Sequence, residues 1–150
     1  MRRPFKSHRE GISVRLSEIE RQFLAGLPEL LEAVDRAPDD PAHARLHVEA
    51  YPDDPEAQRD MTEYSGSQLA EARDADRQRF LASLDRPVLD REEAQAWLTV
   101  LGDARLALAA RLGITEPGWE TANEEDPERI TLGFLSFLQD QLVDVLMDQL

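Results

Sequence analysis

Cysteine is absent from this chain of 150 residues, and lysine occurs once against sixteen arginines. A chain without cysteine forms no disulfides, offers no thiolate to a metal and carries out no thiol redox chemistry. This composition agrees with a reducing compartment, so we expect a cytoplasmic protein.

Long apolar runs and catalytic motifs are missing as well. No stretch approaches 18 consecutive apolar residues, so we expect no membrane-spanning segment. The basic N-terminus is not followed by an apolar core, so it does not have the pattern of a signal peptide. There is no glycine-rich nucleotide loop, nucleophile-elbow serine or zinc-protease motif. His43 and His47 are spaced i, i+4 but lack a third ligand, so the sequence predicts no catalytic, cofactor or metal residues and no enzyme.

Negative charge dominates the chain, but it is unevenly placed. The net charge is −14, yet residues 1–16 carry five basic side chains against one glutamate, so the remainder carries −18. The basic residues are Arg2, Arg3, Lys6, Arg9 and Arg15. We interpret them as solvent-exposed positive charges that partly balance the negative charge of the rest of the chain. The alternative is an anion or nucleic-acid contact, which would be weak because an acidic body repels phosphates.

The N-terminal third predicts a hairpin followed by a kinked helix. Residues 12–16 alternate between apolar and polar, and Glu10-Gly11 supplies a turn, so residues 1–16 predict a β-hairpin. Ser17 and Glu20 have capping-box spacing, which starts a helix over residues 17–36. Gly26 and Pro28 interrupt its apolar stripe and predict a kink or break near Gly26.

The rest of the chain predicts three longer helices and two acidic connections. Residues 35–54 hold three prolines and six acidic side chains (five aspartates and one glutamate), so the sequence predicts an irregular acidic connection over 37–53. Helices are predicted over 55–85, 90–112 and 127–150, each after a capping aspartate, with an acidic loop over 114–125. The expected fold is mainly α, a single domain over 1–150 built as a bundle of about four helices with a short N-terminal β-hairpin.

Arg105 is an anomaly on the helix predicted over 90–112. A helical wheel places it in the middle of the apolar stripe, where a lone charge is costly to bury without a partner. We predict a structural buried charge in an ion pair, with Glu20 as one candidate partner. The alternatives are extension of the side chain to solvent and a ligand-binding arginine in a cleft.

The last predicted helix is apolar over more than half of its circumference. Only Gly133, Ser136, Asp140 and Asp144 form a narrow polar strip. Such a helix is either central in the domain or shared with a partner. Central packing is favoured, and the alternative is a homodimer through residues 130–150.

Four segments in order resemble a known bacterial family. They are F-K-x-x-x-x-G-I-S-V-R-L-S-x-x-E from Phe5, Y-P-D-D-P-E-A from Tyr51, W-L-T-V-L-G-D-A-R from Trp97 and F-L-S-F-L-Q-D-Q-L-V-D-V-L from Phe134. The resemblance is to the AosR-like family of small acidic proteins, which includes an oxidation-sensing transcriptional regulator. Genes of this family commonly lie beside that of the Clp protease adaptor ClpS.

The resemblance implies a non-enzymatic cytoplasmic regulator that binds a protein partner and acts with the transcription machinery. The family's thiol switch is not carried over, because this chain has no cysteine. The alternative that the gene neighbourhood suggests is a protein-binding module linked to Clp-dependent proteolysis.

Overall fold

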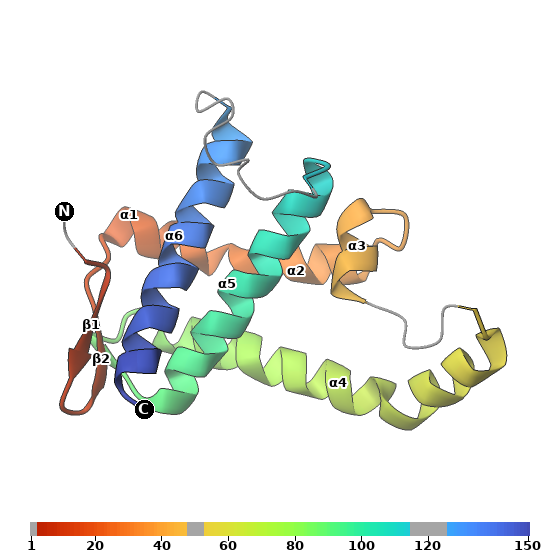
Figure 1. The fold of residues 1–150 in the computed structure, drawn as a ribbon, viewed down its shortest axis with the longest axis horizontal. Coiled ribbons are helices and arrows are strands. Elements are labelled where there is room, and N and C mark those ends of the chain that lie inside the picture. Colours follow the sequence, from red (N-terminus) through yellow and green to blue (C-terminus); the bar gives the residue numbers. More distant parts are fainter. Residues whose placement is uncertain (1–2, 48–52, 115–125) are drawn as a thin grey trace.

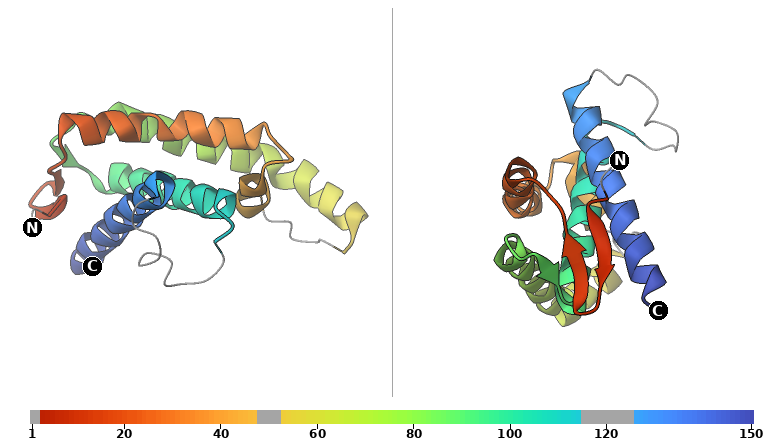
Figure 2. Two further views of the ribbon diagram at one scale, coloured as in Figure 1. Left: turned by 90° about the horizontal axis from the view of Figure 1, so that it is seen from above. Right: turned by 90° about the vertical axis from the view of Figure 1, so that its left-hand side faces the viewer.

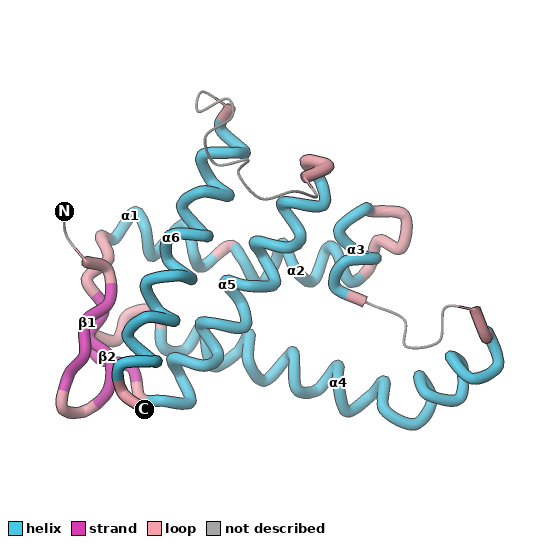
Figure 3. Tube along the Cα trace, in the orientation of Figure 1, coloured by secondary structure: helices cyan, strands magenta, loops and turns pink. Residues whose placement is uncertain are grey.

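The computed structural model describes residues 3–47, 53–114 and 126–150. It confirms a mainly α fold with an N-terminal hairpin, although these residues form six helices rather than about four (Figures 1 and 3). The elements in chain order are β1 Phe5–His8, β2 Gly11–Val14, α1 Glu18–Ala25, α2 Leu27–Asp35, α3 Pro41–Leu46, α4 Pro55–Ser83, β3 Val88–Leu89, α5 Arg91–Arg111 and α6 Pro127–Asp148.

The predicted hairpin is part of a three-stranded antiparallel sheet of order β1-β2-β3. Phe5 pairs with Val14 and His8 with Gly11, and β3 pairs with the other edge of β2. Gly11 has φ +147°, and a Cβ there would lie 1.9 Å from the carbonyl oxygen of Leu89. Only glycine fits this turn. Strand β3 could not be predicted from the sequence, because two residues are too few to show alternation.

The region predicted as one kinked helix contains two separate helices. Ser17 and Glu20 form the expected capping box. The Ser17 backbone nitrogen donates to Glu20 Oε1 at 2.7 Å, and the Glu20 backbone nitrogen donates to Ser17 Oγ at 3.1 Å. Gly26 ends α1, and Pro28 lies in the first turn of α2, where its missing N–H costs nothing.

The connection predicted as irregular over 37–53 contains the short helix α3, which corrects that expectation. Asp40 caps it by accepting from the Ala42 nitrogen at 2.9 Å. Six residues show too little periodicity for α3 to be recognised in the sequence. The predicted acidic loop falls mainly on residues 115–125, which lie outside the described residues.

Helix α5 is the centre of the domain. It packs against α2, α3 and α4 on one side and against α6 on the other, an arrangement that is visible from above in Figure 2. Trp97 is fully buried between Phe5 and Phe80, with ring centroids 6.0 and 5.0 Å away. Its indole nitrogen donates to Ser83 Oγ at 2.8 Å. The tryptophan therefore joins the sheet, α4 and α5.

Helix α6 packs with one face on α5 and also contacts β1. Its buried apolar residues are Leu132, Leu135, Leu138 and Leu142. By length and apolar composition, α6 alone among the described helices could cross a membrane. A helix at the core of a soluble domain has the same length and composition.

Candidate interaction surface on helices α1 and α6

Four large apolar side chains lie on α1 and the N-terminal half of α6, and three of them are exposed while Phe134 is half-buried. Ile19 is 79% exposed and Phe23, one turn further along α1, is 38% exposed. The Phe23 ring lies 5.8 Å from that of Phe134 on α6. Ile130, one turn before Phe134, is 56% exposed. We call Ile19, Phe23, Ile130 and Phe134 the apolar strip.

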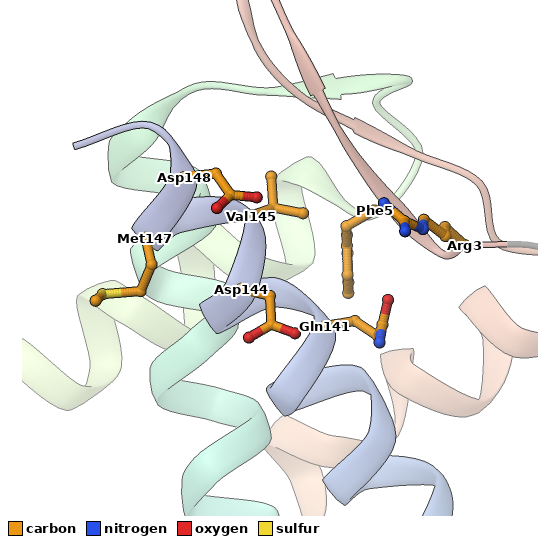
Figure 4. Close-up of a pocket in the computed structure, with 7 residues that line it drawn as sticks. All are labelled: Arg3, Phe5, Gln141, Asp144, Val145, Met147 and Asp148. Atoms are coloured by element: carbon orange, nitrogen blue, oxygen red, sulfur yellow. The ribbon is translucent and has the colours of Figure 1, made fainter.

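A cleft lies between the C-terminal half of α6 and the start of the hairpin (Figure 4). It has a volume of about 390 Å³ and is lined by Arg3, Phe5, Gln141, Asp144, Val145, Met147 and Asp148. Phe5 is fully buried, whereas Asp144 and Asp148 are exposed. The cleft therefore combines an apolar floor with two carboxylates of α6.

The apolar strip and the cleft share one face of α6. The residues that define this face are Ile130, Phe134, Phe137, Gln141, Asp144 and Asp148. They are separated by 4, 3, 4, 3 and 4 residues, the spacing of a helix seam in a coiled coil. The face is apolar toward the start of α6 and acidic toward its end. At its start this face contacts Phe23 of α1, and near its end it lines the cleft with Arg3 and Phe5.

The structure divides the basic residues that the sequence grouped together. Lys6 pairs with Ser13 across the strands, and Arg15 follows two residues later, so both lie on the solvent face of the sheet. Arg9 lies in the turn. Arg3 points to the opposite side, into the cleft beside α6. Arg2 lies outside the described residues.

Arg105 is half-buried, and its partner is an amide rather than a carboxylate. Its Nη1 donates to Gln139 Oε1 at 3.1 Å, which corrects the prediction of a buried ion pair. Glu20, the candidate partner, closes its own capping box instead. The wheel was misleading because the buried face of α5 also includes small residues outside the predicted stripe. These are Ala96, Val100 and Ala107.

The charge that is buried lies elsewhere, where α2, α3 and α4 meet. Arg77 is 8% exposed and donates to Asp35 Oδ2 at 2.7 Å, while His47 Nε2 lies 2.8 Å from Asp35 Oδ1. Arg73 Nη1 lies 3.0 Å from His47 Nδ1. Because arginine only donates, His47 Nδ1 accepts this bond while Nε2 faces Asp35. We call Asp35, His47, Arg73 and Arg77 the polar cluster.

Two carboxyl groups at this end of the molecule have pKa values shifted in opposite directions. Burial opposes ionisation of Asp35, but hydrogen bonds from Arg77 and His47 outweigh it and lower its pKa. Burial raises the pKa of Asp103 on α5, although Arg77 and Arg73 act against that rise. Sequence analysis missed the cluster because Asp35 and Arg77 are 42 positions apart.

The histidines at i, i+4 spacing take part in this cluster. The rings of His43 and His47 stack with centroids 4.2 Å apart, and both nitrogens of His47 have protein partners. Within residues 3–47, 53–114 and 126–150, no group of three or more histidine, aspartate or glutamate side chains is placed to hold a metal ion.

A family model described as a domain of unknown function, DUF2017, matches residues 2–146. The chain belongs to the DUF2017 family. The match spans nearly the whole chain, so the apolar strip and the polar cluster both lie within the DUF2017 domain. No curated protein and no solved structure matches this chain significantly.

Proposed function

We propose that this DUF2017 protein is a non-enzymatic, cytoplasmic regulator that acts by binding a protein partner. The observation that carries the proposal is the apolar strip. Single exposed apolar residues are ordinary on a protein surface, but contiguous ones with polar neighbours mark interaction sites. The strip joins two helices through the contact between Phe23 and Phe134.

The resemblance to AosR-like regulators supports a role in transcriptional control under oxidative stress. The thiol switch has no counterpart here, because the chain has no cysteine. Any response to oxidation would therefore reside in the partner or in the three methionines, of which Met147 is 62% exposed.

The placement of the basic residues favours protein over DNA as the direct partner. Arg3 faces the cleft with its two carboxylates, whereas Lys6 and Arg15 lie on the other face of the sheet. A phosphate backbone is held by several cations on one surface, and each one contributes to affinity through counterion release. Because the basic residues lie on two different faces of the sheet, neither face has enough cations to bind nucleic acid tightly.

Co-purification from cells of the source organism tests this proposal. The tagged wild-type protein is compared with Ile130→Asp and with the matched control Leu69→Asp, because these two side chains are similarly exposed at 56% and 54%. We expect a specific partner with the wild type and the control, and its loss with Ile130→Asp. Equal recovery with all three proteins would contradict a role for the strip. The identity of the partner distinguishes a transcription regulator from a component of Clp-dependent proteolysis.

A further inference from the structure

Helix α6 has a second face that the domain core covers only in part, because Phe134 and Phe137 are half-buried against the core whereas the ends of the face are exposed. Its first face, from Leu132 to Leu142, is buried on α5. The second face begins with Ile130 and Phe134 in the apolar strip and ends with Asp144 and Asp148 in the cleft. Apolar side chains at alternating intervals of three and four are the pattern with which one helix packs along another.

We propose that this face binds an amphipathic helix of a partner protein, with basic residues at one end. The apolar stripe of that helix would lie on the apolar strip, and its basic end would lie in the cleft against Asp144 and Asp148. This inference rests on the proposed function and specifies the chemistry of the partner.

The charges along α6 explain why the end of the partner helix that lies in the cleft would be basic. Asp140, Asp144 and Asp148 follow one another at intervals of four, and like charges at this spacing destabilise a helix. They also lie in its C-terminal half, where the helix dipole is already negative, and the last turn has no basic residue. A cationic partner would relieve this repulsion. Arg3 faces the cleft from the hairpin side, so the lining still carries one net negative charge.

The same charges disfavour the other occupants of this face. In a two-fold dimer each copy presents the same surface. If the two α6 helices were parallel, Asp144 and Asp148 of one copy would face the same residues of the other copy. If they were antiparallel, these carboxylates would lie on the apolar strip of the other copy. The phosphates of nucleic acids and of anionic membranes would be repelled by these carboxylates. A basic helix has no such conflict.

A displayed peptide library tests the proposal on the full chain. The library encodes 21-residue helices with apolar residues at the a and d positions and random residues elsewhere. We expect selected peptides that fail to bind Ile130→Asp and that gather arginine or lysine at one end. Their affinity should fall about tenfold for Asp144→Asn/Asp148→Asn, a change of roughly 1.4 kcal/mol.

A matched double variant separates a local effect from the overall negative charge. Asp60→Asn/Glu63→Gln removes two exposed carboxylates from the far part of α4, so it has the same net charge as the double variant in the cleft. It should bind the selected peptides as the wild type does. Circular dichroism verifies that each variant is folded.

Three outcomes would overturn the inference. Peptides whose binding requires Ile130 but does not change in the Asp144→Asn/Asp148→Asn variant would still support a protein-binding strip. They would refute the proposal that one end of the partner helix is basic. Peptides that ignore Ile130, or no selected peptides at all, would remove the face as a docking site. Sedimentation that shows a dimer of the wild type, but not of Ile130→Asp, would assign the face to a second copy.

Discussion

The two ends of the domain are held together by different forces. At the end that contains the sheet, α1 and α6, the core is apolar and centres on Trp97 between Phe5 and Phe80. At the other end, near α3, the contacts are ion pairs and hydrogen bonds that centre on Asp35. Helix α3 buries little besides Ala42, and Arg111 holds its cap residue Asp40 at 2.7 Å.

This difference indicates where a partner would bind. At the apolar end, some large apolar side chains remain at the surface instead of entering the core. These side chains form the apolar strip. Farther along, the exposed residues Met61 and Leu69 lie eight positions apart on α4, or about 12 Å along the helix axis. Exposed apolar residues therefore occur at both ends, but among the described residues those of the apolar end are linked across two helices by the contact between Phe23 and Phe134.

The largest expected effect is the loss of the central side chain at the apolar end. Trp97→Ala should lower the free energy of unfolding by about 3–5 kcal/mol, because it leaves a cavity between three elements. Urea denaturation measures this change. Ser83→Ala is the control for the indole hydrogen bond and should cost only about 1 kcal/mol. A loss below about 1 kcal/mol for Trp97→Ala would show that this end is not organised around the tryptophan.

The polar end should respond to pH in the acid range. Asp35→Asn should cost about 2 kcal/mol at neutral pH, since it weakens hydrogen bonds to a charged group. The lowered pKa of Asp35 means that its contribution is complete above the ordinary value of 3.8 and is lost as the pH falls through the lowered value. Wild type and variant should therefore converge in stability at low pH. A difference that does not change with pH would contradict the ion-pair account.

Arg105→Ala should have a smaller effect, about 1 kcal/mol, because a half-buried side chain loses one hydrogen bond to a neutral amide. Gln139→Ala should cost a similar amount, and the double variant should cost less than the sum of the two. A loss of 3 kcal/mol or more would mean that Arg105 is the buried ion-pair residue that the wheel predicted.

Asp103→Asn should have the smallest effect, and the opposite sign. The raised pKa of Asp103 means that its contribution is present below the ordinary value of 3.8 and is lost as the pH rises through the raised value. Replacing it should therefore stabilise the protein by about 0.5 kcal/mol at neutral pH, and the gain should fade on acidification. Destabilisation at neutral pH would show that the carboxylate serves Arg73 and Arg77 as a partner.

Local signals in the sequence were sufficient to predict most of the helices. Ser17 starts α1 with the predicted capping box, Asp90 caps α5 as predicted, and Gly26 ends α1 where the apolar stripe is interrupted. These features depend on residues within one turn of each other, so their spacing is visible in the sequence.

Features that depend on distant residues were not predictable in this way. The polar cluster needs Asp35 and Arg77 to meet, and nothing local to either residue specifies that contact. The apolar strip was equally hidden, because Ile19 and Phe23 look like core residues until α1 is seen to bury only Leu24. The sequence showed that α6 is apolar over more than half of its circumference. Which side of α6 remains exposed depends on how α5 and the hairpin cover the helix, and that is not visible in the sequence.

Photo-crosslinking in living cells tests most directly whether the apolar strip is a partner surface. A benzophenone amino acid replaces Phe23 on the strip or, as a control, Leu81 on α4, whose exposed fractions are 38% and 44%. The account predicts a covalent adduct with one other protein from position 23 and none from position 81. Equal crosslinking at both positions, or none at position 23, would contradict it.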